Sequence, residues 1–378
     1  MPDETVMMKA NTRTQRNSSF ELLRIVSMVM IVFHHFAVHG GFEWDASSVS
    51  IPYLWCNFIS MGGKIGVNVF VLISGYFLVK REGPVFDFKR ILKFEGQLLF
   101  YSIAACLFGL MVPGKLGIQA FIEAIFPITS SCWWFASTYF VLFLLHPFLN
   151  KLLACLDRKS YQALLVLLVT CWSVIPTLTT APYQGSDLSW FITLYAISGY
   201  ARLYGFNPKL TSGHYFLLCG IFSVLTYVSS AVSALLGRKW RILFSVATYC
   251  YGQEKLPMLL ISLTLFMGFA AWKMAYHKWI NVAASATFGV YLIHDHPLVR
   301  PFLWRHVLQN ARYQDSLMLI PYSVMAAAIV YAVCTAIDLL RQRLIEQAYM
   351  RVVNTYADSW LKPFERVCGF LKQIVFGK

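Results

Sequence analysis

The chain has 378 residues, of which 58% are hydrophobic and 13% are charged, and its formal net charge is +14. Soluble domains carry about 25% charged residues, so this composition excludes an ordinary soluble enzyme and predicts an all-α bundle of membrane helices. Basic residues of such proteins gather in cytoplasmic loops and against anionic headgroups, so we expect the positive charge to face a lipid bilayer and not nucleic acid.

About ten apolar segments recur along the chain, each close to the roughly 20 residues that a helix needs to cross a bilayer. No internal repeat is visible among them, and residues 1–17 are mostly polar without a cleavable signal, so we interpret the first segment as a retained span. The predicted spans are 20–38, 54–79, 91–112, 133–155, 161–178, 188–204, 215–236, 256–274, 283–300 and 317–340.

The basic residues predict that both termini are cytoplasmic. Lys and Arg precede the first span and follow the second and the fourth, whereas loops 39–53 and 179–187 contain neither. Loops 237–255 and 300–312 are also basic, although the order of spans places them outside. Either these two loops have a function or one of the later spans is misassigned.

The end of the chain differs from the rest. Residues 341–378 mix apolar and basic residues, which predicts an amphipathic helix on the inner membrane surface. We therefore divide the chain into a membrane domain, 1–340, and a cytoplasmic tail, 341–378. The nine cysteines show no Cys-x-x-Cys spacing, so we expect neither a disulfide framework nor a zinc site, and only a Cys56–Cys132 bridge stays open.

The first span contains two ionisable residues, Arg24 and His35, eleven positions apart. Eleven residues make about three turns and a rise of ~16 Å, so both side chains lie on one helix face, and His34 points ~80° away. Charged groups in lipid are costly and usually face a cavity or a partner. One interpretation is an anion-binding Arg with a His base deeper in the membrane. The other is that Glu21 simply neutralises Arg24.

The second span contains four glycines. Small residues let helices approach closely, and no strand precedes the segment, so we interpret them as packing positions and not as a phosphate-binding loop. Ser74 and Tyr76, in the same span, could project hydroxyl groups into a cavity. The glycines are Gly62, Gly63, Gly66 and Gly75.

A basic cluster follows the second span. The general excess of positive charge in cytoplasmic loops accounts for it, and the alternative is a site for the phosphates of a nucleotide-like donor, because Arg and Lys are the usual phosphate partners. The cluster consists of Lys80, Arg81, Lys89, Arg90 and Lys93.

Two further segments carry polar or aromatic side chains. His294, Asp295 and His296 are too closely spaced to share one helix face, so we expect no metal site from them alone. They either make local hydrogen bonds at a helix end or bring a His–Asp pair to His35 across a cavity. Trp134 and Tyr139 begin the fourth span, where such residues anchor a helix at the interface or stack on sugar rings.

Taken in order, these segments resemble the membrane-bound acyltransferase family 3. The hallmark of that family, an Arg and a His separated by ten residues in the first span, is matched by Arg24 and His35. Residues 66–78 (GVNVFVLISGYFL), Trp134-Phe-x-x-x-Tyr139 and Tyr291-Leu-Ile-His294 also match the family in order. One departure is Arg90-Ile-Leu-Lys93, where the family often has Arg-x-x-Arg, because Lys keeps the charge but loses the planar donor fork.

The resemblance implies an enzyme of the cell membrane that moves an acyl group, most often acetyl, from acyl-CoA to a sugar hydroxyl of a surface or exported polysaccharide. It implies His35 as catalytic base and Arg24 as the CoA-side contact, with acetyl-CoA as co-substrate and no resident cofactor or metal. We predict Arg24, Arg81, Lys89, Arg90 and Lys93 on the donor side, and Ser74, Tyr76, Trp134, Tyr139, His294 and Asp295 around the acceptor or cavity.

The rival interpretation is a proton-coupled transporter or flippase, in which Arg24, His35 and Asp295 form a proton relay. It needs no acyl-CoA, and the lack of repeats argues against an inverted-repeat transporter.

Overall fold

The computed structural model describes residues 16–80, 87–111, 117–179 and 185–376, and confirms an all-α membrane bundle. Within these residues there is no strand, and eight helical stretches are long and apolar enough to cross a membrane. They are Ser18–His39 (α1), Ile51–Leu78 (α2), Phe88–Met111 (α3), Trp134–Ala154 (α5), Arg158–Leu178 (α6 and α7), Ser212–Leu236 (α9), Arg241–Ala271 (α10 and α11) and Leu319–Ala357 (α15 into α16).

Two of the ten predicted spans are not among these eight stretches. The segment predicted at 188–204 is α8, Asp187–Tyr204. The segment predicted at 283–300 is broken into α12 (Lys278–Ser285), α13 (Thr287–His294) and α14 (Val299–Pro301). The break between α13 and α14 has a plain cause. Pro297 has no N–H to donate to a helical hydrogen bond, and it disfavours helical backbone in the residue before it. The break frees Asp295 and His296 from regular helix.

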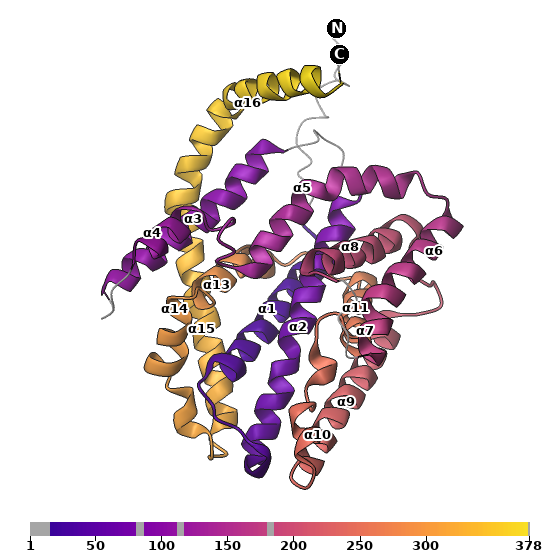
Figure 1. Cartoon of the computed structure of the whole chain (residues 1–378), viewed down its shortest axis with the longest axis vertical. Helices are drawn as coiled ribbons and strands as arrows, with labels where there is room; N and C mark the ends of the chain where they lie inside the picture. Colours follow the sequence, from indigo (N-terminus) through magenta and orange to yellow (C-terminus); the bar gives the residue numbers. More distant parts are fainter. Residues whose placement is uncertain (1–15, 81–86, 112–116, 180–184, 377–378) are drawn as a thin grey trace.

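Helices α1 and α2 pack against each other at the centre of the bundle (Figure 1). The side chain of Asn17 caps α1 by accepting the N–H of Ser19 at 3.0 Å. Glycines of α2 form the contact: a Cβ on Gly63 would lie 2.2 Å from Cγ of His34, and one on Gly66 would lie 2.6 Å from the carbonyl oxygen of Ser27. The glycines therefore allow the two backbones to approach closely.

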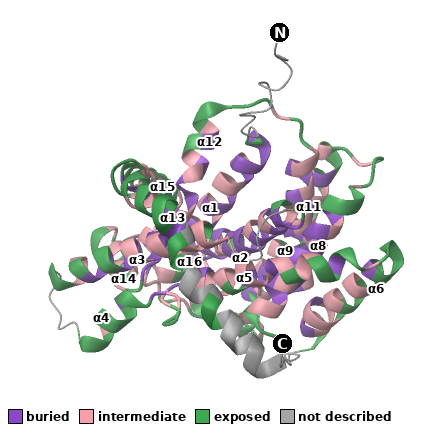
Figure 2. Cartoon of the chain, turned by 90° about the horizontal axis from the view of Figure 1, so that it is seen from above, coloured by how far each residue is buried: buried purple, intermediate pink, exposed green. Residues whose placement is uncertain are grey.

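The remaining helices surround this pair. Helices α8, α9 and α11 (Leu256–Ala271) contact α2, whereas α12, α13 and α15 (Leu319–Arg341) contact α1. In the most apolar stretch of α2, 78% of the residues are buried, whereas in that of α9 only 11% are. Helix α2 is therefore a core helix, and α9 presents most of its surface outward. In Figure 2 the buried residues gather around α1, α2 and α8, while α4 (Ile118–Ile125) and α6 (Arg158–Val169) are largely exposed.

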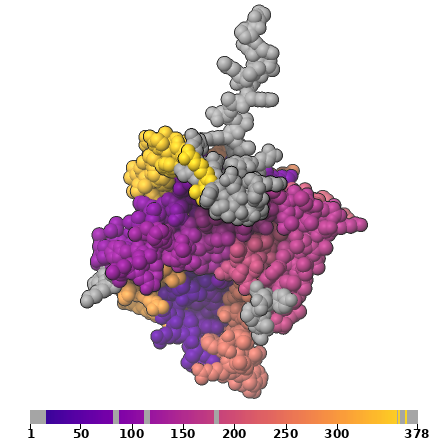
Figure 3. Space-filling model, turned by 45° about the horizontal axis from the view of Figure 1, so that its top comes forward, coloured from indigo at the N-terminus to yellow at the C-terminus, as the bar shows by residue number. Residues whose placement is uncertain are grey.

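The predicted boundary at 340/341 falls inside a continuous helical run. Helix α15 passes through a π-helical turn, Gln342–Glu346, into α16 (Gln347–Phe376). Helix α16 lies along α3 (Figure 3), with the hydroxyl of Tyr349 donating to the carbonyl of Lys93 at 3.2 Å. The first turns of the predicted tail are therefore part of the bundle.

Basic residues of the two conflicting loops make specific contacts. Arg238 donates to the carbonyl of Val49, and Lys255 donates to the carbonyl of Pro176. Arg300 pairs with Asp295 at 3.2 Å. These basic residues make tertiary contacts, so their presence does not indicate on which side of the membrane the two loops lie. The eight cysteines whose side chains the structure describes, Cys56 and Cys132 included, are free.

Candidate active site

Arg24 and His35 line two different cavities. The His35 cavity has a volume of about 280 Å³ and the Arg24 cavity about 470 Å³. The two adjoin, because three aromatic side chains line both: Phe70, Phe135 and Phe288. These three side chains form an aromatic wall between the cavity that contains Arg24 and the cavity that contains His35.

His35 belongs to a chain of hydrogen bonds that fixes its tautomer. Nδ1 of His294 lies 2.6 Å from the carbonyl oxygen of Val290, and Nε2 of His294 lies 2.8 Å from Nδ1 of His35. A carbonyl oxygen only accepts, so in neutral His294 Nδ1 carries the proton and Nε2 accepts. Nδ1 of His35 must therefore donate, which leaves Nε2 of His35 with a free lone pair.

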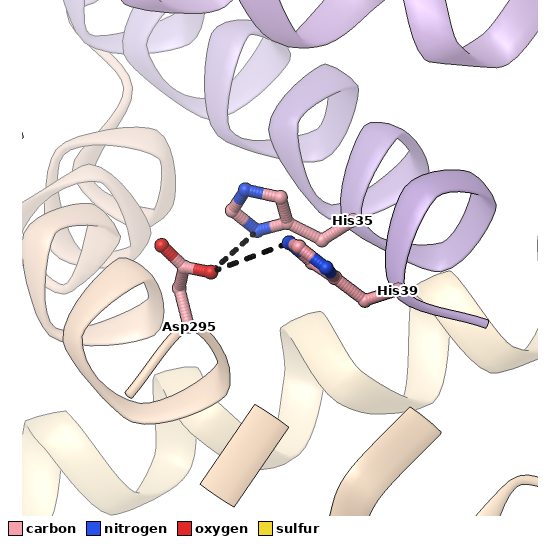
Figure 4. Close-up of side chains that lie close together, drawn as sticks. All are labelled: His35, His39 and Asp295. Atoms are coloured by element: carbon pink, nitrogen blue, oxygen red, sulfur yellow. Dashed lines mark ion pairs between the residues drawn. The ribbon is translucent and has the colours of Figure 1, made fainter. Parts of the chain in front are cut away.

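A carboxylate lies beside the same imidazole. Oδ1 of Asp295 is 3.6 Å from Nδ1 of His35 and 3.9 Å from Nε2 of His39 (Figure 4). Both distances exceed hydrogen-bond length, so Asp295 stands beside the two rings without a hydrogen bond to either. Its closest ionic partner is Arg300, whose Nη1 is 3.2 Å away. The structure thus brings a His–Asp pair to His35, the second of the two arrangements considered from the sequence.

His35, His39 and Asp295 also satisfy the spacing of a metal site, since one ligand atom of each lies within 4.8 Å of the others. The sequence did not predict this trio. The guanidinium of Arg300 lies 3.4 Å from Nε2 of His39 as well as beside Asp295. The fixed positive charge of Arg300, next to two of the three ligands, disfavours a divalent cation there.

His34 also lines the His35 cavity, but its hydrogen bond goes to α2. Its Nδ1 donates to the carbonyl of Ser60 on α2, and its ring packs on Gly63. The predicted difference between the two neighbouring histidines therefore has a structural counterpart: His34 joins α1 to α2, and His35 faces α13.

The Arg24 cavity combines cations with acidic partners. Arg24 pairs with Glu21, as the neutralising interpretation requires, and still lines the cavity. Lys93 also lines it and pairs with Glu346 at 2.6 Å. Both ion pairs are partly exposed, so an anionic ligand could exchange with the carboxylates.

Arg341 is a further cation of this cavity that the sequence analysis placed in the tail. It is 3% exposed and held by Asp338 at 2.8 Å and Glu346 at 2.9 Å. The signal was present in the sequence, since Asp338 and Arg341 stand three residues apart at the end of an apolar span, the spacing of a helical ion pair.

The other predicted donor residues are placed differently. Arg90 pairs with Asp87 at 3.3 Å, and its side chain is 56% exposed. Neither Arg90 nor Lys89 is among the residues that line the Arg24 cavity. Arg81 lies outside the described residues. Among the predicted donor residues that the structure describes, only Arg24 and Lys93 meet at one cavity.

The predicted acceptor residues divide between the two cavities. Ser74 and Tyr139 line the Arg24 cavity, Trp134 and Asp295 line the His35 cavity, and His294 lies behind His35. Tyr76 lines neither, because its ring packs on Phe20 and its hydroxyl faces Arg202 at 3.4 Å. Sequence reasoning missed Lys64 and Tyr291, which line the His35 cavity although both stand in segments it had singled out.

Comparison with protein families agrees with these observations. The Acyltransferase domain model of acyltransferase family 3 matches residues 17–339. Comparisons with curated proteins and with solved structures returned no match. Because the family match spans most of the chain and contains both Arg24 and the His35 cavity, the protein belongs to acyltransferase family 3 and is a multi-pass membrane acyltransferase.

Proposed function

We propose that the protein is a cell-membrane O-acyltransferase that moves an acyl group, acetyl in the first instance, from acyl-CoA to a sugar hydroxyl of a surface or exported polysaccharide. The observation that carries this proposal is the hydrogen-bond chain from Val290 through His294 to His35, which leaves Nε2 of His35 able to accept a proton inside a cavity. That is the requirement for a general base acting on a hydroxyl group.

The reaction follows from this arrangement. Nε2 of His35 takes the proton of the sugar hydroxyl while the hydroxyl oxygen attacks the carbonyl carbon of the thioester. Asp295, 3.6 Å from Nδ1 of His35, stabilises the imidazolium that forms. The tetrahedral intermediate then expels the CoA thiolate, which takes the proton from His35. The products are the sugar ester and CoA, and His35 is neutral again.

The Arg24 cavity suits the anionic part of the donor. Arg24, Lys93 and Arg341 line it, and Arg and Lys are the usual partners of phosphate. A rise of ~16 Å separates Arg24 from His35 along α1, a span that the pantetheine arm of acyl-CoA can bridge through the aromatic wall. The donor phosphates would then bind in the Arg24 cavity, and the acyl group would be transferred in the His35 cavity.

Analysis of the cell-surface polysaccharide, with and without the gene, tests the proposal. We expect base-labile acetyl esters in wild-type cells, their loss on deletion, and their return with the wild-type gene but not with His35→Ala. Purified protein in detergent should release free CoA from acetyl-CoA when this polysaccharide is supplied. Acyl transfer without a membrane gradient would exclude the transporter interpretation, whereas identical ester content with and without the gene would refute the proposal.

A further inference from the structure

The His35 cavity contains an ammonium group that the acyl transfer described above does not use. Lys64 extends from α2 into the cavity beside Gly63 and Val67. Its Nζ lies over the ring of Trp134, 5.1 Å from the centroid, in a cation–π contact. No hydrogen bond or ion pair joins Lys64 to any other residue in the described part of the chain. The indole holds the ammonium at the cavity wall but supplies no negative charge.

The acidic residues around Lys64 are each engaged elsewhere. Three carboxylates lie near enough to act on Lys64 electrostatically. Asp187 accepts from Nε2 of Gln253 at 2.6 Å, and Glu254 pairs with Lys255 at 3.8 Å. The third is Asp295, which pairs with Arg300 at 3.2 Å. Lys64 therefore makes no ion pair with any of the three, although the charge of Asp187, which bonds to a neutral amide, still acts on it.

The charge of the cavity follows from these pairings. Among the described residues that line it, Lys64 and Arg300 are cations and Asp295 is the acid. With the histidines neutral, the cavity carries one positive charge in excess. A cation at membrane depth that makes no ion pair is costly and marks a functional site. The excess charge lies in the chamber of His35, apart from the Arg24 cavity that suits the donor phosphates.

We propose that the acceptor is an acidic sugar, whose carboxylate or phosphate group binds Nζ of Lys64 while a neighbouring hydroxyl is presented to Nε2 of His35. This inference rests on the proposed function and adds the chemical class of its acceptor. The anion would complete the charge balance of the cavity and fix the orientation of the ring, so that one hydroxyl is selected. Lys64 is then a binding and specificity residue, and proton transfer stays with His35.

The position of the ester in the wild-type polysaccharide tests the proposal first. Acetyl groups that depend on the gene are mapped by NMR and mass spectrometry to individual sugar residues. We expect them on a residue that bears a carboxylate or a phosphate, and the mapping shows which. Esters on a residue with neither group would overturn the inference and leave the proposed function intact. Absence of any gene-dependent ester would overturn both.

Variants of Lys64 then test the contact itself, with oligosaccharide from gene-deleted cells as acceptor. A matched neutral acceptor is made by reducing its carboxylates to alcohols or by removing its phosphates. We expect wild-type protein to prefer the acidic acceptor, and Lys64→Met to lower kcat/KM for it by about 10- to 100-fold, the worth of one hydrogen bond to a charged group. The loss should appear in KM, and Lys64→Arg should recover part of the preference.

A control lysine is available on the surface. Lys239 also lies over an indole, 5.0 Å from the centroid of Trp240, but lines neither cavity. Lys239→Met should leave kcat/KM unchanged, and elution of each variant from a sizing column checks its fold. If Lys64→Met lowers kcat equally for acidic and neutral acceptors, Lys64 stabilises the reaction intermediate and the inference is wrong. If it lowers neither, the lysine has no role in binding.

Discussion

The imidazole of His35 can serve as a base because its other nitrogen already has a partner. A neutral imidazole has one donor and one acceptor nitrogen, and the bond to His294 at 2.8 Å assigns the donor to Nδ1. The carbonyl of Val290 in turn fixes His294. The second histidine therefore positions the first, as a carboxylate does in other general-base systems.

We predict that His35→Ala lowers kcat by about 10²- to 10⁴-fold, the usual contribution of a general base, while the protein still inserts and folds. His34→Ala is the matched control, since that ring lines the same cavity but bonds to the carbonyl of Ser60 and not to His294. Acetyl transfer from acetyl-CoA by the purified proteins measures both. Equal losses in the two variants would contradict the assignment.

His294 tests the tautomer argument separately. In His294→Phe, Nδ1 of His35 loses its acceptor, so the ring can take the other tautomer and Nε2 then carries a proton. We expect kcat to fall by at least about tenfold with KM for the donor unchanged. In His294→Gln the side-chain oxygen can still accept from His35, and we expect part of the activity to return. No difference between the Phe and Gln variants would refute the argument.

Arg24 has two roles to separate, because it pairs with Glu21 and also lines the Arg24 cavity, where we propose that the donor binds. If it binds donor phosphates as a planar fork, Arg24→Lys should impair transfer strongly, since Lys keeps only the charge. Exchange of the pair, Glu21→Arg with Arg24→Glu, should then be inactive as well. Activity of the exchanged protein near the wild-type rate would reduce Arg24 to a structural partner of Glu21.

At the scale of the helices, the contact between α1 and α2 determines where the histidines lie. We predict that Gly63→Ala lowers thermal stability, because the added Cβ would lie 2.2 Å from Cγ of His34 and overpacking costs about 1–3 kcal/mol. Gly220→Ala on α9 is the control, since no atom lies within 4 Å of the new Cβ. Thermal unfolding in detergent compares them, and an equal midpoint for both would show that the helices adjust freely.

At the scale of the molecule, the Arg24 cavity brings together cations from α1, α3 and the end of α15. We predict that Lys93→Gln raises KM for acetyl-CoA several-fold, since Lys93 lines this cavity and a charge-assisted bond to phosphate is lost. The effect should shrink in high salt because Lys93 is 52% exposed and exposed charges are screened. Arg90→Gln, outside the cavity, should leave KM unchanged. A larger effect of Arg90→Gln would move the donor site away from Lys93.

The sequence by itself determined the class of protein and the two candidate functional residues of α1, Arg24 and His35. Hydropathy and helical periodicity are local properties, so they placed Arg24 and His35 on one face ~16 Å apart. They also predicted that His34 points in another direction, and its hydrogen bond does go to α2, although its ring still lines the His35 cavity. They also identified the glycines of α2 as packing positions, which the contacts of Gly62, Gly63 and Gly66 with α1 and of Gly75 with α8 bear out. The predicted span 283–300 included the short polar interruption from Asp295 to Pro297, because a hydropathy average over many residues does not detect a break in the helix.

Only the tertiary structure decided which residues surround His35 and Arg24. The bond between His35 and His294 joins positions 259 residues apart, and no local pattern encodes how two distant helices pack. The same reason explains why Lys93 reaches the Arg24 cavity and Arg90 does not, and why Arg341 belongs to that cavity. Arg90 and Lys93 stand about one turn apart on α3, and the packing of the bundle alone determines which of them reaches the cavity.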